Sequence, residues 1–284
     1  MAGAKGLVSG VIPFSSVDGP GNRFVLFLQG CNFDCIACHN PHTISPCNDC
    51  GLCAHVCPSG ALSLEHGVVR WNDALCTSAE LCIARCPYDA TPKARWHTVD
   101  EIVADIRAHA PYLSGVTVSG GEATQQAAFV RALFEALRDD DTLGRLHRLV
   151  DSNGAAPQDV WDELADAMDG AAIDLKAFDD EVHRRMTGAS NALVLRSIEL
   201  LAARGSLHEV RLLLLPGVND RLDDLARCGA WLHRVDPNLR VKVIGFRRHG
   251  VRPRAAQVDE PSAAEMGAYA EALRGIGLTN VELV

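Results

Sequence analysis

The chain has 284 residues, of which 48% are hydrophobic and 22% charged, and its formal net charge is −9. These values are ordinary for a globular protein with one large domain and a small insertion, and the acidic balance gives no sign of a nucleic-acid partner. No run of about 18 apolar residues is present and the first 11 residues lack a signal-peptide layout, so we expect a cytoplasmic protein without a membrane span.

From residue 25 onward, short apolar strands alternate with helices. We expect strands over 25–29, 116–118, 149–152, 171–175, 210–215 and 241–246, and helices over 99–110, 126–138, 157–168, 191–204, 220–234 and 262–275. Thr98 and Glu101 form a capping box ahead of the first of these helices. Strands that are each followed by a helix predict parallel β/α units, and about six units make either an open doubly wound sheet or a partial barrel.

Polar residues follow these strands in succession. They are 120–122, 151–153, Asp174 with Lys176, Arg211 with Pro216, and 247–249. The carboxyl ends of parallel strands carry the functional site in α/β folds. Five successive polar sets at strand ends therefore predict a single active-site face.

Cysteine usage is unusual, because 10 of the 11 cysteines lie between Cys31 and Cys86. Disulfide frameworks belong to short secreted chains, so bound metal is the better interpretation in a cytoplasmic protein. Cys228 stands apart within a predicted helix, where we expect a buried structural thiol.

The first cysteine group is Cys31, Cys35 and Cys38, spaced C-x3-C-x2-C and followed by His39. Thiolates suit zinc or iron–sulfur centres. Three ligands in one tight loop leave one corner of a four-iron cluster open, and an open metal position can bind and activate a small molecule. The alternative is a zinc loop that takes its fourth ligand elsewhere, such as His39.

The second group has the bacterial ferredoxin spacing C-x2-C-x2-C-x3-C-P, formed by Cys47, Cys50, Cys53 and Cys57 with Pro58. A second run follows as Cys76, Cys82 and Cys86 with Pro87, but the position of its expected second cysteine is Ala79. Because the last cysteine of each run ligates the other cluster, Cys47, Cys50, Cys53 and Cys86 make one complete set.

The remaining set is Cys57, Cys76 and Cys82, which is one ligand short. Three interpretations of this set stay open: a three-iron cluster, a four-iron cluster with a non-cysteine ligand such as Glu80, or no cluster at all. For the insertion as a whole, the alternative is a zinc-ribbon module. We expect an inserted ferredoxin-like domain over 43–91 and a core over 1–42 and 92–284.

The motifs in combination resemble the radical S-adenosylmethionine (SAM) superfamily, and within it the glycyl radical enzyme activating enzymes of the YjjW type. The resemblance covers essentially the whole chain. It rests on 18–21 (DGPG), the C-x3-C-x2-C loop, 38–40 (CHN), 120–122 (GGE), 151–154 (DSNG), 174–176 (DLK), and Arg211 followed by Pro216-Gly217. It implies an α/β fold with a partial (β/α)6 radical SAM barrel.

The resemblance also implies roles. Cys31, Cys35 and Cys38 would hold a [4Fe-4S] cluster whose open iron binds SAM, and Asp18 would lie near the glycyl loop of a partner. SAM contacts are implied for Ala37, His39, Gly120, Gly121, Glu122, Lys176 and Arg211, with Gly121 letting the backbone approach the methionine portion of SAM. A monovalent cation is implied at Asp151, Ser152, Ala172 and Asp174.

The implied reaction is reductive cleavage of SAM to methionine and a 5′-deoxyadenosyl radical, which takes hydrogen from a glycine of a partner glycyl radical enzyme. A low-potential donor such as flavodoxin or ferredoxin would supply the electron, and we expect a monomer. Two alternatives are a radical SAM enzyme acting on a small molecule or peptide, and a non-catalytic electron-transfer module. The chain departs from the family pattern at Ala37, which is often aromatic, and at Ala79. It also departs at Arg247, which is commonly His near the adenosine; the two alternatives there are that His249 takes over or that Arg247 itself stacks.

Overall fold

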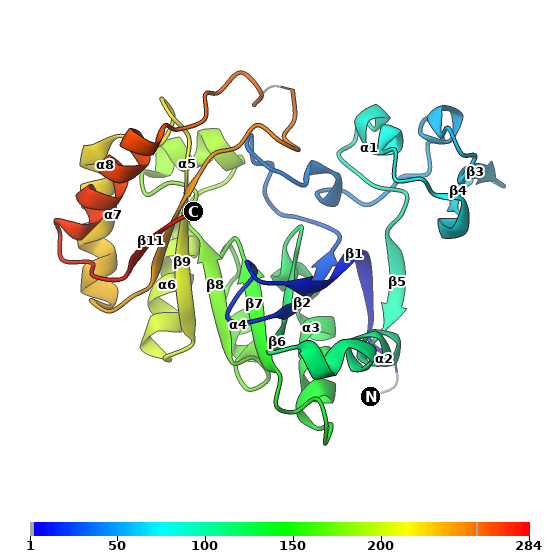
Figure 1. The fold of residues 1–284 in the computed structure, drawn as a ribbon, viewed down its shortest axis with the longest axis horizontal. Coiled ribbons are helices and arrows are strands. Elements are labelled where there is room, and N and C mark those ends of the chain that lie inside the picture. The colour runs from blue at the N-terminus through cyan, green and yellow to red at the C-terminus, as the bar shows by residue number, and fades with distance from the viewer. Residues whose placement is uncertain (1–2, 254) are drawn as a thin grey trace.

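The computed structural model describes residues 3–253 and 255–284, and its main feature is a nine-stranded sheet of order β11-β10-β9-β8-β7-β6-β2-β1-β5 (Figure 1). Six parallel strands form its centre: β2 (Arg23–Leu28), β6 (Gly115–Gly120), β7 (His147–Ser152), β8 (Gly170–Asp174), β9 (Leu207–Leu214) and β10 (Val241–Gly245). They confirm the predicted parallel (β/α)6 architecture, and every predicted strand overlaps one of them.

Three strands of this nine-stranded sheet were not predicted. β1 (Lys5–Ser15) pairs antiparallel with both β2 and β5 (Arg95–Thr98), and β11 (Val281–Leu283) adds a short parallel strand beside β10. The expectation that 25–29 is the first strand was therefore wrong. β1 contains two glycines and is half-exposed along much of its length, so it lacks the apolar run typical of a buried parallel strand.

The helices follow the expected periodicity. The structure has α2 (Val99–His109), α3 (Ala127–Arg138), α4 (Gln158–Leu164), α5 (Asp180–Thr187), α6 (Ala192–Ala203), α7 (Leu222–Val235) and α8 (Ala263–Arg274). The Thr98–Glu101 capping box is confirmed in both directions. α5 was not predicted, and α4 ends four residues before the expected Met168. Short 3-10 helices cover Pro41–Thr43, Ala54–Val56, Asp73–Leu75, Ala110–Tyr112 and Ala123–Gln126.

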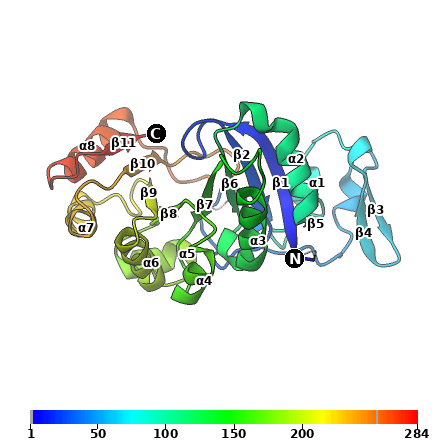
Figure 2. The ribbon, with the colours of Figure 1, turned by 90° about the horizontal axis from the view of Figure 1, so that it is seen from below.

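The core lies between the sheet and its covering helices, and Figure 2 shows α3, α4 and α6 packed along one side of the strands. Cys228 on α7 is 2% exposed within this core, as expected for a structural thiol. At the amino ends of the strands Arg23 is fully buried, and its guanidinium donates to Thr117 Oγ1, to the carbonyls of Val116 and His147, and to Pro20 O. Arg23 therefore closes that end of the sheet.

The part of the chain that follows the Cys31–Cys38 loop, up to β5, forms a separate lobe beyond the β1–β5 edge (Figure 1). It contains the antiparallel pair β3 (Leu62–Glu65) and β4 (Val68–Trp71), the helix α1 (Leu81–Arg85), and a small core of Cys53, Leu62, Val69 and Cys82. A bridge between Ser45 and Ala90 joins the two ends of the lobe. The domain limits at 43 and 91 stay a prediction.

Within the described residues, no helix is both long and apolar enough to cross a membrane.

Candidate functional site

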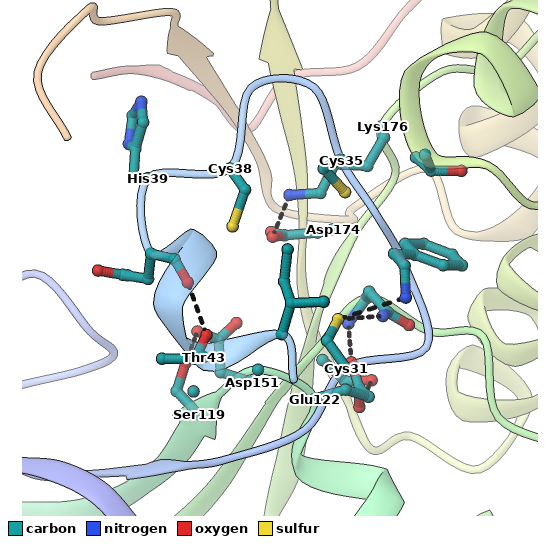
Figure 3. A pocket seen from close by; sticks show the side chains of 18 of the residues that line it. Cys31, Cys35, Cys38, His39, Thr43, Ser119, Glu122, Asp151, Asp174 and Lys176 are labelled. Carbon is teal, nitrogen blue, oxygen red and sulfur yellow. Dashed lines mark hydrogen bonds and ion pairs between the residues drawn. The ribbon is translucent and has the colours of Figure 1, made fainter. Parts of the chain in front are cut away.

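The loop after β2 carries the first cysteine group to the carboxyl ends of the parallel strands. Gly30, at a φ of 104°, turns the chain out of β2, and its N–H donates to Thr43 O at 2.8 Å. Cys31 N–H donates to Ile44 O at 3.0 Å, and Asp34 and Ile36 N–H donate to the carbonyls at the end of α5. The loop is thereby fixed on both sides, and Cys31, Cys35 and Cys38 line one cavity of about 270 Å³ (Figure 3).

The three thiols are suited to hold a cluster in a sheltered place. Burial raises the pKa of Cys31 to about 12 and that of Cys35 to about 11, and it also raises the pKa of Cys38. These thiols are therefore protonated at neutral pH in the bare protein, and binding of iron must displace their protons. Cys31 Sγ accepts hydrogen bonds from Phe33 N–H at 3.4 Å and from Asn153 Nδ2 at 3.8 Å, which orients its sulfur.

In the structure, His39 does not point toward the three cysteines and so cannot serve as the fourth ligand of a zinc ion. His39 Nε2 lies 3.0 Å from Arg247 O, and Figure 3 shows its ring at the rim, turned away from the sulfur atoms. In the described part of the chain, no three His, Cys, Asp or Glu side chains converge tightly enough to hold a single metal ion. A four-iron cluster is larger than one ion and spaces its thiolates further apart, so the separation of these side chains suits a cluster better than a single zinc ion.

A charged wall faces the cysteines across the cavity. Asp151 at the end of β7 accepts from Ser119 Oγ at 2.8 Å and from Arg211 Nη1 at 2.9 Å, and Lys176 Nζ lies 2.7 Å from Asp174 Oδ2. Burial raises the pKa of Asp151. For Asp174 the opposing charges of Lys176 and Arg211 outweigh burial, so its pKa is lowered, and the pKa of Lys176 is raised because Asp174 outweighs its burial.

Arg211 lies inside β9 rather than past the strand end, which corrects the expectation. It pairs in register with Asp174 of β8 and Lys242 of β10. Its Nε donates to Glu209 Oε1 at 2.5 Å, and Glu209 is 1% exposed, with Arg240 and Lys242 each 3.4 Å away. This buried ionic network fixes the guanidinium from below the cavity.

The Gly120-Gly121-Glu122 turn ends β6. A Cβ on Gly121 would lie 2.2 Å from Gly30 O and 2.7 Å from Thr43 O, so glycine is required where this turn packs against the cysteine loop. This reason differs from the expected approach of SAM. Glu122 is 1% exposed, and its carboxylate accepts four hydrogen bonds, from Thr124 N and Oγ1, Ser152 Oγ and Asn153 N. Burial raises its pKa, and its geometry ties the ends of β6 and β7 together.

Asp18 reaches the cavity from the opposite end of the sheet. Its loop joins β1 to the amino end of β2, yet Asp18 lines the cavity together with the cysteines. Thr117 Oγ1 donates to Asp18 O at 2.7 Å, and Ser15 Oγ donates to its carboxylate. The DGPG loop therefore folds inward beneath the cysteine loop.

Most of the predicted site residues meet at this cavity. Its lining includes Asp18, Cys31, Cys35, Ala37, Cys38, His39, Gly120, Gly121, Glu122, Asp151, Ser152, Asp174 and Lys176. Arg211, Arg247, His249, Pro216 and Ala172 do not line it, and Ser152 Oγ is directed to Glu122. The ligand roles of the lining residues, including the cation site, stay predictions. The structure adds Phe33, Ser119, Met186 and Thr187, of which Met186 and Thr187 come from the unpredicted α5.

The second and third cysteine groups gather as the ferredoxin spacing predicts. One hollow of the lobe is lined by Cys47, Cys50, Cys53 and Cys86, and another by Cys57, Cys76 and Cys82. Ala79 and Glu80 are exposed at the second hollow, and Lys93 lines it as well. Ala79 offers no ligand atom, so three thiols are the whole cysteine supply of that hollow. Their roles as iron ligands stay predictions.

Comparison with known proteins agrees with the architecture and the cysteine loop. The family model described as the radical SAM superfamily matches residues 25–228. The isethionate sulfite-lyase activating enzyme of Nitratidesulfovibrio vulgaris is 32% identical over 250 residues, covering 79% of either chain. The 4-hydroxyphenylacetate decarboxylase activating enzyme of Clostridioides difficile is 30% identical over 271 residues, covering 87% of this chain and 83% of the relative.

Among solved structures, QueE from Escherichia coli superposes with a TM-score of 0.56 at 11% identity, covering 98% of this chain and 92% of QueE, which bears on the fold alone. The chain belongs to the radical SAM superfamily, in the family of the glycyl radical enzyme activating enzymes. It is a radical SAM enzyme, and the cofactor of that superfamily is a [4Fe-4S] cluster that binds SAM.

Proposed function

We propose that this enzyme installs a glycyl radical on a partner enzyme. The observation that carries the proposal is the single cavity shared by the three-cysteine loop, the charged wall and Asp18. Relatives named as activating enzymes at about 30% identity support the same function. The substrate is then a glycine in a loop of the partner, and the enzyme itself works as a monomer in the cytoplasm.

The cavity fits the cofactor that the family uses. Cys31, Cys35 and Cys38 are free thiols, and their three sulfur atoms leave one corner of a four-iron cluster for SAM. When bound, the cluster and SAM together supply one-electron cleavage to methionine and a 5′-deoxyadenosyl radical, which takes a hydrogen atom from the glycine Cα. The protein contributes position and the exclusion of water.

Lys176 and Arg211 are the cations that would orient SAM. Lys176 is 18% exposed on the cavity wall, which leaves its ammonium within reach of a carboxylate. Arg211 is not among the lining residues but bonds to Asp151, which is, and its Nη2 is buried without a hydrogen-bond partner among the described residues, so it keeps unused donors. We assign the carboxylate of SAM to these two groups. Ala37, His39 and the Gly120–Glu122 turn would border its remaining atoms, and Asp151, Ser152, Ala172 and Asp174 would hold the monovalent cation.

Asp18 marks the side from which the glycine would approach. Its carboxylate is held by Ser15, and its loop reaches the cavity from the opposite end to the cysteine loop. A glycine segment lying over Asp18 would therefore present its Cα to the cavity without disturbing the cysteine loop. Asp18 is the residue that we assign to the partner's glycyl loop.

The lobe would supply the electron. Its complete set of Cys47, Cys50, Cys53 and Cys86 suits one auxiliary [4Fe-4S] cluster, and the hollow at Cys57, Cys76 and Cys82 would hold a second, incomplete centre. A low-potential protein such as flavodoxin or ferredoxin would reduce this lobe.

The test is anaerobic turnover of reconstituted enzyme with SAM and a strong reductant. We expect 5′-deoxyadenosine from the wild type and from C228A, which removes a buried cysteine outside the cavity, and none from C35A. A radical on a candidate partner would then separate the activase from an enzyme that acts on a small molecule or peptide. Fully iron-loaded wild type that leaves SAM intact would refute the proposal.

A further inference from the structure

Arg252, in the segment between β10 and α8, contacts two distant parts of the chain at once. Its Nη2 donates to Cys35 O at 2.5 Å, and its Nη1 lies 2.5 Å from Asp34 Oδ1 and 2.7 Å from Asp89 Oδ2. The side chain is 13% exposed. Asp34 and Cys35 belong to the cysteine loop, whereas Asp89 belongs to the end of the lobe.

Asp89 stands at the neck where the lobe rejoins the core. It follows Cys86 by three residues, and its carbonyl accepts from Ser45 N–H at 3.0 Å beside the Ser45–Ala90 bridge. Its neighbours Ala90 and Pro92 line the hollow of Cys47, Cys50, Cys53 and Cys86. The neck therefore lies directly against the complete cysteine set.

The segment that carries Arg252 is itself held over the cysteine loop. Ala255 is 1% exposed and packs in one cluster with Ala37 and Phe246, and Ala255 N–H donates to Arg252 O at 2.9 Å. In Figure 1 this orange segment runs along the same end of the sheet as the blue cysteine loop. Packing of this segment therefore holds Arg252 in contact with both the cysteine loop and Asp89.

We propose that Arg252 is a positioning residue for electron delivery, which fastens the neck of the lobe to the loop of the catalytic cysteines. The proposal rests on the proposed function of the two cysteine sets. One electron would pass from a reduced centre at Cys47, Cys50, Cys53 and Cys86 to the centre at Cys31, Cys35 and Cys38, and no bond would form or break. The electron originates from the low-potential protein donor.

A second contact joins the same two regions through the backbone. Cys31 N–H donates to Ile44 O, and the next residue, Ser45, donates to Asp89 O. Loss of Arg252 would therefore slow the transfer without abolishing it. Lysine cannot replace arginine here, because one ammonium lacks the planar fork that reaches Cys35 O and Asp89 together.

The experiment compares two reductants on the full-length, reconstituted enzyme. Reduced ferredoxin or flavodoxin delivers electrons through the lobe, whereas titanium(III) citrate is small enough to reduce the catalytic centre directly. For R252Q and R252K we expect an unchanged iron content. With the protein donor, 5′-deoxyadenosine should form about tenfold more slowly, as a small misplacement can cause. With titanium(III) the rate should be unchanged. R248Q is the matched control, since among the described residues the Arg248 side chain bonds within its own segment, to Val258 O and Asp259.

D89N provides a second variant that leaves Arg252 and Cys35 in contact. We expect the same loss with the protein donor, and no further loss in the double variant, because both residues act through one contact. Equal rates for wild type and R252Q with the protein donor would overturn the inference, as would an equal fall with both reductants. Wild type that yields no 5′-deoxyadenosine with titanium(III) would instead refute the proposed function on which the inference rests.

Discussion

Lys176 Nζ and Asp174 Oδ2 lie 2.7 Å apart on the wall of the cavity, at the end of β8. Burial alone would favour a neutral carboxyl group at Asp174, and Lys176 reverses that preference together with Arg211. The pair therefore keeps a negative and a positive charge side by side in the place where the amino acid end of SAM is proposed to bind.

Replacing Lys176 with Met should weaken SAM binding and lower stability. The unpaired Asp174 would cost about 2 kcal/mol at pH 7, less than the about 3–5 kcal/mol of a fully buried pair because both groups keep some contact with water. K5M is the matched control at an exposed lysine. Isothermal titration with SAM on the cluster-loaded enzyme should show weaker binding only for K176M, and equal affinity would contradict the assignment of Lys176.

The same variant should change the pH dependence of stability. In the wild type the pKa of Asp174 is lowered, so its stabilising contribution is fully present above the unfolded pKa of about 4 and is lost only as pH falls through the lower folded value. Without Lys176, burial dominates, Asp174 takes up its proton at higher pH, and the deficit relative to wild type shrinks on acidification. Thermal unfolding of the bare protein between pH 7 and pH 4 measures this, and a deficit independent of pH would contradict it.

Gly121→Ala should loosen the cysteine loop. Its new Cβ would meet Gly30 O at 2.2 Å and Thr43 O at 2.7 Å, both of them backbone atoms that cannot rotate away. We expect a loss of about 1–3 kcal/mol, typical of overpacking, and selective loss of iron from the catalytic site. G10A is the control, since no atom lies within 4 Å of its added Cβ. Full iron loading in G121A, measured with the lobe intact, would show that the turn tolerates a side chain.

The parts of this site that follow from local spacing were predictable, and the parts that depend on tertiary contacts were not. In two-cluster ferredoxins the last cysteine of each C-x2-C-x2-C-x3-C-P run ligates the cluster of the other run, so the grouping of Cys86 with Cys47 could be expected. Strand–helix alternation likewise indicates the parallel sheet. β1 was missed because it is antiparallel and half-exposed, and the role of Arg252 has no local signal, since its partners Cys35 and Asp89 are remote in sequence.

Arg211 is one residue whose position could not be predicted from the sequence alone. The sequence suggests a polar residue past the end of a strand, yet Arg211 sits within β9 beside the buried Glu209. A charge inside an apolar strand is tolerated because Glu209 and Asp151 both pair with it. Such pairing is visible only when neighbouring strands are placed next to one another.

Ala79→Cys should complete the second hollow of the lobe. With Cys57, Cys76 and Cys82 it would supply four thiolates, and we expect about one additional iron per chain, since four cysteines complete a [4Fe-4S] cluster. The electron paramagnetic resonance spectrum of the oxidised wild type should show a three-iron signal that A79C removes. S78C adds a cysteine one position away and should leave the iron content unchanged. Identical iron and spectra for wild type and A79C would contradict a three-iron centre in this hollow.

The most direct test of the proposed function follows one hydrogen atom. A candidate glycyl radical enzyme is prepared with glycine deuterated at Cα and incubated anaerobically with this enzyme, SAM and reductant, and the 5′-deoxyadenosine is analysed by mass spectrometry alongside resonance spectra of the partner. We predict 5′-deoxyadenosine carrying one deuterium together with a glycine-centred radical on the partner. Unlabelled 5′-deoxyadenosine without a partner radical, obtained with a partner that a known activating enzyme does activate, would contradict the activase function for that partner class and favour a small molecule or peptide as the substrate.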